Sequence, residues 1–346
     1  MNFTAEHILN IPVHFILCTE RTGSSLLSLS LNLNPKILSP SEEPFAIFFY
    51  KKYKNKTNWT SKEISDFVEE FWLMAEKNLD LFFSSKLKLK KDLEIFKDNL
   101  PYQLLIRIIY LQFVEIKPKN EIECIIDKQI KYFFYLPVLF EIFPTAKFCI
   151  LVRDVRDNVV SKSNHKLNSS SNPIYLSALW NYTYSNIEYL IKYKKEYIIT
   201  KYENFVSQPE KELKTICLFF NVDFSSSMLE TEGKYESFLE LRKDMVDPKF
   251  INYLSKFQKS LYSGINPKKI GVYKTELSKE VEGKIIKLNR KLFDSFSYEY
   301  NSNNIRKINL KEHIFVLFAY LYRPFLLKLY YEIPFPIKLL IKKIRK

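Results

Sequence analysis

Short apolar runs alternate with segments of helical periodicity along most of the chain. Residues 15–18, 121–127, 147–152 and 197–201 are candidate strands, and apolar residues at helical spacing follow them. A continuous apolar run such as residues 148–152 is typical of a parallel strand that is covered on both faces. Strands that alternate with helices in this way predict an α/β fold, in which helices flank a central parallel sheet of about four to five strands.

The turn after the first strand has the composition of an anion-binding loop. It reads T-E-R-T-G-S-S over residues 19–25, and a helical segment starts at Leu26. A tight turn between a strand and a helix presents backbone N–H groups, and the helix dipole favours an anion there. An ATP-binding loop would need a lysine after its last glycine to serve a nucleotide that carries Mg²⁺. That lysine is missing, so we expect a phosphate group without a metal; a simple helix cap by Thr22 or Ser24 is the alternative.

A second polar turn follows the strand at residues 147–152. It reads R-D-V-R-D over residues 153–157, and a helical pattern continues to Ser161. Ligands of open α/β sheets bind beyond the carboxyl ends of the strands, where Arg153 and Ser161 would lie. The guanidinium fork of an arginine matches phosphate oxygens, and a serine hydroxyl one helical turn further on adds another hydrogen bond. We therefore expect a second phosphate site at Arg153 and Ser161.

These two elements resemble those of the sulfotransferase superfamily. R-T-G-S-S-L-L resembles its R-S-G-T-T-L-L loop, which binds the 5′-phosphosulfate of 3′-phosphoadenosine 5′-phosphosulfate (PAPS). R-D-V-R-D-N-V-V-S resembles its R-D-P-R-D-x-x-x-S element, which binds the 3′-phosphate. Three further motifs lie in family order, at Asp127-Lys128, at K-Y-E-N-F (201–205) and at I-G-V-Y-K-T-E-L (270–277).

The resemblance covers about residues 10–300 and is closest in motif style to bacterial carbohydrate and tyrosylprotein-type sulfotransferases. It implies a P-loop-like three-layer fold and the transfer of a sulfuryl group from PAPS to a hydroxyl acceptor. It also implies which residues bind the co-substrate. Those at the 5′-phosphosulfate are Arg21 and the backbone N–H groups of Thr22, Gly23, Ser24 and Ser25. Arg153 and Ser161 bind the 3′-phosphate, and Tyr202 approaches the adenine.

The resemblance further implies the groups that carry out the transfer. Lys128 reaches the bridging oxygen and stabilises the leaving phosphate, together with Arg21. A general base must take the proton of the acceptor hydroxyl, and Glu42 lies at the family position of that base, while the neighbouring Glu43 stays an alternative. His165 is a rival base, although it follows the 3′-phosphate helix, far from the sulfuryl group. We expect no metal, because cations and amides suffice to disperse the charge.

Two further charged residues, Glu20 and Arg156, lie within or beside these motifs and are not expected to bind the co-substrate. Glu20 stands where the family has proline, and a carboxylate beside an anion site opposes binding unless its side chain points away. Arg156, in the second turn, is expected to pair with Asp157 or Glu203 rather than to touch the co-substrate.

The chain is basic and contains few cysteine and histidine residues. Its 53 Lys and Arg residues against 39 Asp and Glu residues give a net charge of +14, which suits an anionic co-substrate. No recognised nucleic-acid motif is present, so we expect no nucleic-acid partner. The 4 cysteines lie in apolar runs without C-x-x-C spacing, and only 4 histidines are present. This predicts buried free thiols, no disulfides and no metal site.

Residues 305–346 differ from the rest, and we divide the chain into a sulfotransferase domain (1–304) and a basic amphipathic C-terminal extension (305–346). The extension has ten Lys or Arg residues against two Asp or Glu residues, and its apolar runs are interrupted at Pro324, Pro334 and Pro336. A basic amphipathic helical tail can lie on an anionic membrane face. Packing on the domain, or on a partner subunit of a homodimer, is the alternative.

The N-terminal residues lack the layout of a signal peptide, and no uninterrupted apolar run reaches about 18 residues. We therefore expect a cytoplasmic protein, at most peripheral at the inner membrane face.

The sequence thus predicts a sulfotransferase whose favoured acceptor, by analogy with prokaryotic relatives, is a carbohydrate or glycolipid. A P-loop nucleotide kinase or other NTPase is one alternative, and the missing lysine after Gly23 disfavours it. A non-catalytic nucleotide-binding protein of the same fold is the other. It is disfavoured because Arg21, Lys128, Arg153 and Ser161 are present together.

Overall fold

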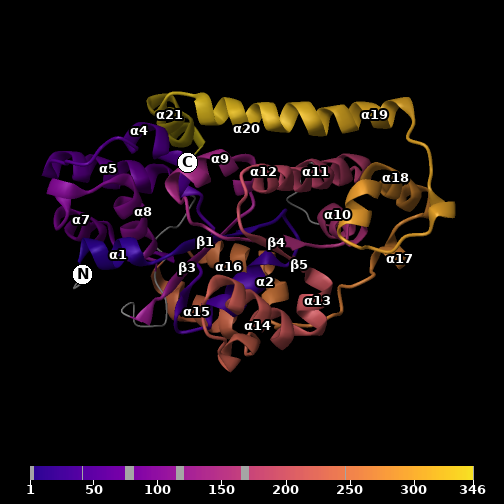
Figure 1. Cartoon of the computed structure of the whole chain (residues 1–346), viewed down its shortest axis with the longest axis horizontal. Coiled ribbons are helices and arrows are strands. Elements are labelled where there is room, and N and C mark those ends of the chain that lie inside the picture. The colour runs from indigo at the N-terminus through magenta and orange to yellow at the C-terminus, as the bar shows by residue number, and fades with distance from the viewer. Residues whose placement is uncertain are drawn as a thin grey trace.

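A computed structural model describes residues 4–40, 42–74, 82–113, 121–164, 171–245 and 247–345 of the chain. Its centre is a sheet of five parallel strands in the order β2-β3-β1-β4-β5. The strands are β1 (Val13–Leu17), β2 (Ile37–Leu38), β3 (Cys124–Gln129), β4 (Phe148–Val152) and β5 (Tyr197–Lys201). The predicted α/β fold with a parallel sheet between helices is therefore confirmed (Figure 1). β2 has no counterpart in the prediction, because two residues are too few to show a pattern.

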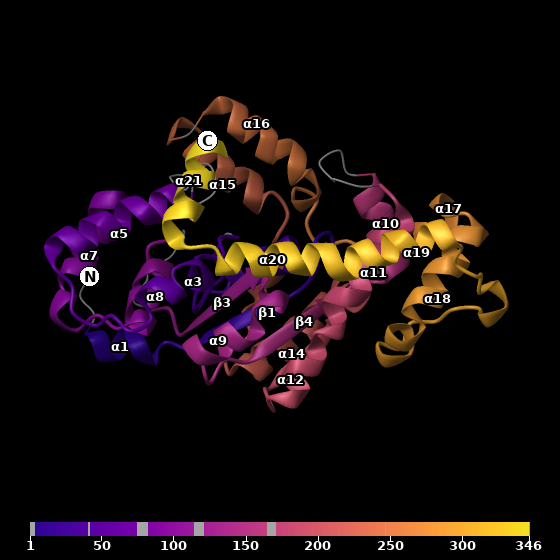
Figure 2. The ribbon, with the colours of Figure 1, turned by 90° about the horizontal axis from the view of Figure 1, so that it is seen from above.

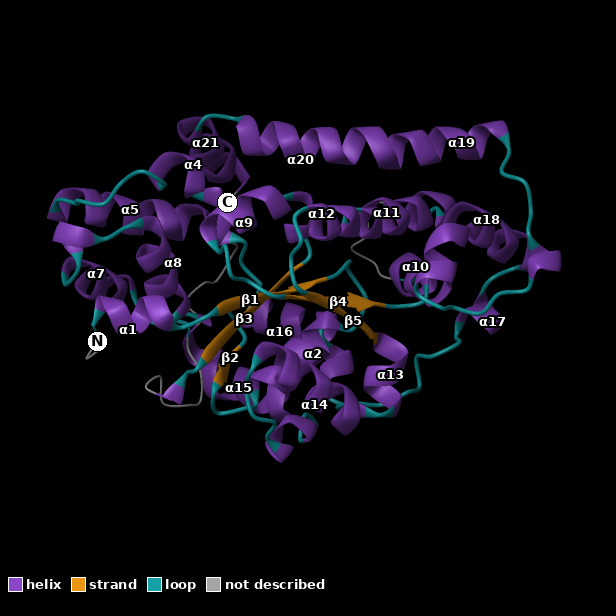
Figure 3. Cartoon of the chain, in the orientation of Figure 1, coloured by secondary structure: helices purple, strands orange, loops and turns teal. Residues whose placement is uncertain are grey.

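Helices cover both faces of the sheet (Figure 3), because alternate residues of each strand point to opposite faces. In β1, Phe15 and Leu17 belong to the hydrophobic cluster on the first face and Ile16 to the cluster on the second. Helices on the first face include α5 (Ser61–Met74), α7 (Lys86–Glu94), α8 (Tyr102–Tyr110), α9 (Leu136–Ile142), α11 (Pro173–Ser185), α12 (Ile187–Lys192) and α18 (Lys279–Ser295). Those on the second face include α2 (Ser24–Asn32), α13 (Tyr202–Ser207), α14 (Pro209–Phe220), α15 (Lys234–Arg242) and α16 (Pro248–Phe257). Shorter helices are α1 (Ala5–Asn10), α3 (Phe45–Phe48), α4 (Tyr50–Tyr53) and α17 (Tyr273–Glu276).

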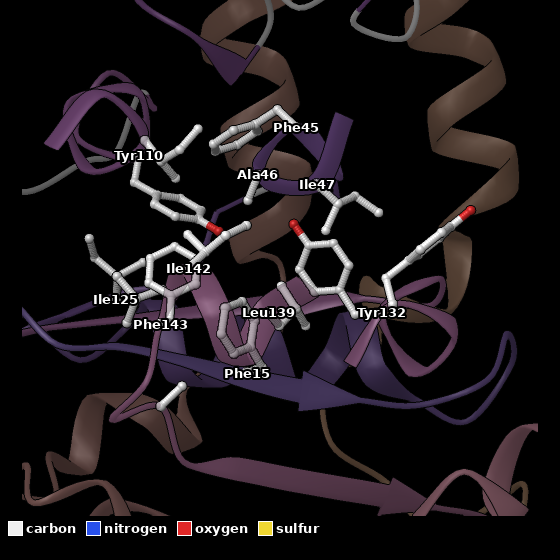
Figure 4. Close-up of a cluster of buried hydrophobic side chains, with 14 of the residues drawn as sticks. Phe15, Phe45, Ala46, Ile47, Tyr110, Ile125, Tyr132, Leu139, Ile142 and Phe143 are labelled. Carbon is white, nitrogen blue, oxygen red and sulfur yellow. The ribbon is translucent and has the colours of Figure 1, made fainter. Parts of the chain in front are cut away.

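The core on the first face is rich in aromatic side chains (Figure 4). The rings of Phe15 in β1 and Phe143 lie 5.4 Å apart between centroids. Tyr110 of α8 donates a 2.6 Å hydrogen bond to the carboxylate of Asp127 in β3. Burial raises the pKa of that carboxyl to about 6. The end of β3 is therefore held from the core side, directly before Lys128.

The helices α2 and α10 (Val155–Ser163) begin at the carboxyl ends of β1 and β4. Gly23 precedes α2 with a φ of 82°, a left-handed conformation that other residues rarely adopt. The carboxylate of Asp154 caps α10 by accepting a 2.8 Å hydrogen bond from the N–H of Arg156. Both helix N-termini thus lie at the carboxyl edge of the sheet, where the sequence predicts two phosphate sites.

The C-terminal segment forms one long helix, Leu310–Glu332, which we call the C-terminal helix. It consists of α19 (Leu310–Leu317), a π-helical turn (Phe318–Tyr322) and α20 (Arg323–Glu332), and α21 (Phe335–Arg345) follows it. Figure 1 and Figure 2 show that the C-terminal helix runs along the outer side of the first helix layer, across α11.

Of the three prolines that interrupt the apolar runs, Pro324 lies within the long helix, Pro334 lies between α20 and α21, and Pro336 lies in the first turn of α21. Pro324 lies in the first turn of α20 and directly follows the π-helical turn. A proline at that position forfeits no α-helical hydrogen bond, so the helix passes through it.

All four cysteines are free and buried, as their apolar surroundings predict. Cys18 directly follows β1, Cys149 lies in β4, and the others are Cys124 and Cys217. Burial raises the pKa of Cys18 to about 11 and that of Cys149 to about 12. The fold therefore uses the thiols as small apolar side chains.

Candidate active site

The loop between β1 and α2 is braced by its own side chains. The fully buried hydroxyl of Thr22 donates a 2.7 Å hydrogen bond to the carbonyl oxygen of Thr19. Arg21 has a φ of 64° and Gly23 a φ of 82°, so the backbone turns twice before α2 begins. The N–H groups of a first helical turn, here including Ser24, have no partners inside the helix. The backbone therefore has the shape that the predicted phosphate cradle requires.

Arg21 and Ser161 are in contact although 140 residues separate them along the chain. The Nε of Arg21 donates a 3.3 Å hydrogen bond to the hydroxyl oxygen of Ser161. Because β1 and β4 are neighbours in the sheet, the turns that follow them meet at its carboxyl edge. The structure thus brings the two predicted phosphate elements into one place.

Arg153 lies beside this contact and is held by three groups. It donates hydrogen bonds to the carbonyl oxygens of Arg21 at 3.1 Å and of Lys269 at 2.7 Å. Its guanidinium also lies 4.6 Å from the ring centroid of Tyr202. The Nε of Arg153 is buried and has no hydrogen-bond partner among the described residues. A buried N–H without a partner is costly, so this atom suits an anion that would accept from it.

The electrostatics of Arg21 and Arg153 also suit an anion. The hydrogen-bond partners named above are a hydroxyl and two backbone carbonyls, all of them neutral. Burial, together with the charge of Arg153, lowers the pKa of Arg21. Two neighbouring positive charges with neutral partners repel each other, and a bound phosphate group would relieve that repulsion.

Lys128 and Glu42 form a second group at the end of β3. The Nζ of Lys128 lies 2.6 Å from Oε2 of Glu42, and the lysine side chain is only 5% exposed. Burial alone would lower the pKa of Lys128, but Glu42, together with Cys18 and Asp127, outweighs it, and the pKa is raised. The charge of Lys128 also acts on the thiol of Cys18, where the phosphate loop begins. Glu42 is thus the carboxylate that contacts the predicted catalytic lysine, while the neighbouring Glu43 is buried.

Glu20 has a cation beside it. Its Oε2 lies 3.6 Å from the Nζ of Lys162 on α10, and the amide of Asn158 donates a 2.9 Å hydrogen bond to its carbonyl oxygen. Asn158 and Lys162 are four residues apart, so they share one face of α10. This four-residue spacing is the signal in the sequence that could have identified Asn158 and Lys162 as partners of Glu20. The carboxylate beside the phosphate loop is thus neutralised instead of opposing an anion.

Asp157 fastens a distant segment to the site, a role that the sequence reasoning did not assign. Its carboxylate accepts hydrogen bonds from the N–H groups of Gly271 at 2.7 Å and Tyr273 at 2.9 Å. Burial raises the pKa of Asp157, while these two hydrogen bonds oppose that shift. Because Asp157 and Ser161 are four residues apart on α10, one helix face carries both the anchor and the hydroxyl that the sequence predicts to bind phosphate.

The predicted partners of Arg156 are wrong. Its guanidinium lies 2.6 Å from the carboxylate of Asp154 and 3.3 Å from that of Glu282. Asp157 is occupied by the backbone of residues 271–273, and Glu203 accepts hydrogen bonds from the N–H of Asp154 and the hydroxyl of Tyr298. Arg156 therefore serves the fold, as expected, but through other carboxylates.

Six predicted site residues therefore meet at one edge of the sheet: Arg21, Arg153, Ser161, Tyr202, Lys128 and Glu42. His165 lies outside the described residues. No group of three or more His, Cys, Asp or Glu side chains in the described ranges could hold a metal ion. The arrangement combines the half-buried Arg21 and the buried Arg153 with a paired lysine and carboxylate at the same edge of the sheet.

The comparisons with known proteins agree with this geometry. Residues 12–226 match the sulfotransferase family. Among solved structures, the sulfotransferase domain of the Synechococcus PCC 7002 olefin synthase matches with a TM-score of 0.56 and 22% identity, over 84% of this chain and 96% of that one. The sulfotransferase domain from the curacin biosynthetic pathway matches with a TM-score of 0.50 and 20% identity, over 84% and 99%. These likenesses show the fold. No curated protein matches the chain.

Proposed function

Since the chain belongs to the sulfotransferase family, we propose that it transfers a sulfuryl group from PAPS to a hydroxyl acceptor. The observation that carries the proposal is the contact between Arg21 and Ser161, with Arg153 beside it. This contact joins the turns after β1 and β4, and each of them supplies cations for one end of a nucleotide with two separate phosphate groups.

The residues present fit the two anionic ends of PAPS. Arg21 and the N–H groups of residues 22–25 would hold the 5′-phosphosulfate at the start of α2. Arg153 and Ser161 would hold the 3′-phosphate, and the partnerless Nε of Arg153 supplies a donor that the folded chain leaves unused among its described residues. Tyr202, whose ring lies under Arg153, would contact the adenine.

Lys128 and Glu42 would handle the charges that develop during transfer. The acceptor oxygen forms a bond to sulfur while the bond from sulfur to the bridging phosphate oxygen breaks. Lys128 would donate a hydrogen bond to that bridging oxygen, which becomes negative. Glu42 would take the proton of the acceptor hydroxyl as the new bond forms. The products are a sulfate ester and adenosine 3′,5′-bisphosphate.

The proposed acceptor is a hydroxyl of a carbohydrate or a glycolipid. Its support is the resemblance to bacterial carbohydrate sulfotransferases and the exposed apolar surface of the C-terminal helix.

Calorimetric titration with adenosine 3′,5′-bisphosphate, against AMP and ATP–Mg²⁺, tests the site. We expect binding that requires the 3′-phosphate and is insensitive to Mg²⁺. Arg153→Ala should lower the ratio of bisphosphate to AMP affinity by about 10- to 100-fold, because charge-assisted hydrogen bonds to the 3′-phosphate are lost. Arg290→Ala, an exposed position on α18, is the matched control and should leave the ratio unchanged.

Two outcomes would overturn the proposal. A preference for ATP–Mg²⁺ would favour a P-loop kinase or NTPase. Bisphosphate binding without transfer of label from PAPS to any hydroxyl acceptor would favour a nucleotide-binding protein that lacks the transfer activity.

A further inference from the structure

The outward side of the C-terminal helix is apolar. Six large side chains on it are between 46% and 65% exposed and line one shallow groove: Ile314, Leu317, Phe318, Leu321, Tyr322 and Phe325. They recur at helical spacing, so they form a continuous stripe, which we call the apolar ridge. Leu310 and Leu329 continue the ridge at its two ends, with exposures of 82% and 44%.

The apolar side chains of this helix contribute little to the hydrophobic core of the protein. Its 23 residues include an 18-residue window with a mean hydropathy of 1.3, and only 6% of that window is buried. A core helix of the same composition would be mostly buried. Large contiguous apolar patches on a protein surface mark sites of contact with another molecule or with a membrane.

The opposite side of the helix is fastened to the body of the protein. Ala319 is fully buried and packs with Ala178 and Leu179 of α11. The hydroxyl of Tyr135 donates a 2.9 Å hydrogen bond to the carbonyl oxygen of Leu327, and the hydroxyl of Tyr320 donates to Asn181. The helix therefore lies flat along the molecule (Figure 1), and only its outer side is open to a binding partner.

The charges around the ridge are those that an anionic surface would attract. Residues 305–346 contain ten Lys or Arg residues and two Glu residues. Lys338 is buried, whereas Arg306, Lys307, Lys311 and Lys328 are exposed on the C-terminal helix or directly before it. Glu312 is paired with Lys284 at 2.8 Å, and Glu332 is paired with Lys51. A second copy of the chain would bring two such basic segments together, which disfavours a dimer at this face. Lipid headgroups of negative charge would instead be stabilised by them.

We propose that the apolar ridge docks on the surface of an anionic lipid bilayer. The C-terminal helix lies in the plane of the interface, with the ridge among the acyl chains and the basic side chains at the headgroups. Aromatic rings suit that boundary, and the rings of Phe318 and Tyr322 stack on the ridge with centroids 4.3 Å apart. This inference does not depend on the proposed function, because none of these residues lies in the phosphate sites.

Vesicle flotation with the full chain tests the inference. We expect binding to vesicles of equal parts phosphatidylcholine and phosphatidylglycerol, weaker binding to phosphatidylcholine alone, and a decrease as salt is raised. Replacing Leu321 and Phe325 together by Asp should lower the vesicle affinity at least about tenfold, because each aspartate would have to enter an apolar environment. Leu218→Asp, at a 79% exposed position of α14 on the other face of the sheet, is the matched control and should bind like the wild type.

All three substituted positions are exposed, so thermal unfolding should be unchanged and a loss of binding would not reflect misfolding. Lack of wild-type binding to the mixed vesicles, or equal binding by the Leu321/Phe325 variant, would overturn the proposal. So would a wild-type dimer in light scattering that this variant converts to monomer without any vesicle binding. Resistance of the bound protein to alkaline carbonate would show a spanning helix instead. Calorimetry with adenosine 3′,5′-bisphosphate is independent of all these outcomes.

Discussion

Lys128 and Glu42 form the residue pair on which the proposed chemistry depends. Their contact is 2.6 Å long, and the lysine is almost completely buried. Each side chain positions the other, and the two would act on opposite ends of the reacting group. A substitution that keeps the shape of the glutamate but removes its charge therefore separates the base from the rest of the site.

Glu42→Gln should leave the affinity for adenosine 3′,5′-bisphosphate unchanged and lower kcat by about 10²–10⁴-fold, the range that a general base contributes. Calorimetry and steady-state kinetics with labelled PAPS measure the two quantities. Glu43→Gln is the matched control, because it changes the neighbouring carboxyl in the same way and should keep kcat. A loss of kcat in Glu43→Gln with normal turnover in Glu42→Gln would show that Glu43, and not Glu42, is the general base.

His14 in β1 makes stability depend on pH. Its ring is buried and stacks on Phe220 with centroids 5.0 Å apart, and its Nδ1 accepts a 3.1 Å hydrogen bond from the N–H of Lys147. Burial, and next the charge of Lys147, lower the pKa of His14 to about 4. The unfolded chain therefore binds more protons than the native state between about pH 4 and 6.5. The stability due to neutral His14 is complete above pH 6.5 and is lost as the pH falls towards 4.

His14→Asn keeps an acceptor at this position but does not titrate. We expect the stability advantage of the wild type over this variant to shrink by about 2 kcal/mol between about pH 7.5 and pH 5. Urea unfolding at both pH values measures it. Asp127 shifts stability in the opposite direction over part of this range, but it is present in both proteins and cancels in the difference. A difference that does not change with pH would mean that folding does not lower the pKa of His14.

At the scale of elements, the turn from β1 to α2 is the most tightly constrained. Gly23 has a φ of 82° and caps α2. A Cβ placed on Gly23 would lie 2.4 Å from Cδ2 of Tyr202, the first residue of α13. The glycine is therefore required both by its backbone conformation and by the ring that packs against it.

Gly23→Ala should cost about 1–2 kcal/mol for the left-handed backbone and a further 1–3 kcal/mol, roughly, for the overlap with Tyr202. Gly233→Ala is the matched control: Gly233 has a φ of 67°, also precedes a helix, and has no atom near its missing Cβ. It should show the backbone cost alone. Denaturant unfolding of both variants measures the difference. In a Tyr202→Ala background, the stability cost of Gly23→Ala should fall to that of Gly233→Ala. If Gly23→Ala and Gly233→Ala cost the same in the wild-type background, the overlap with Tyr202 is excluded.

The sequence predicts the elements of this fold well where their pattern is local. The strands β1, β3, β4 and β5 each contain a short apolar run, which is continuous only in β4, and the turns after β1 and β4 carry recognisable motifs. The two-residue β2 carries no pattern, and the helix through Pro324 depends on a π-helical turn that no local rule signals. The site follows the same division. The motifs identify Arg21 and Ser161, but the anchoring of residues 271–273 by Asp157 depends on contacts more than 100 residues apart in the chain.

At the scale of the whole molecule, the C-terminal helix adds an outer layer to one side of the sheet. It buries Ala319 against α11 and leaves the apolar ridge outward. The two sides of the sheet are therefore unlike: one presents the ridge and its basic flanks, and the other presents α13, α14 and α15. Docking of the helix onto α11 decides whether the ridge is held in a fixed plane.

Ala319→Leu should destabilise this docking by about 1–3 kcal/mol, because a larger side chain does not fit between Ala178 and Leu179 without displacing the helix. Thermal unfolding measures the change. Leu317→Ala, on the exposed side of the same helix, is the matched control and should change stability by less than about 0.5 kcal/mol. If Ala319→Leu did not change the stability, the C-terminal helix would not be packed on α11.

The four buried cysteines also allow local unfolding to be measured by thiol labelling of the unmodified chain. A maleimide reacts with a thiolate that it can reach, and here each thiol is covered and its pKa is raised. Labelling therefore waits for the surrounding structure to open, and its rate measures the free energy of that opening. Cys18 directly follows β1 and precedes the predicted phosphate loop, whereas Cys217 lies in α14. A nucleotide in the loop would slow the labelling of Cys18, so occupancy can be followed through the unmodified chain, without an added probe.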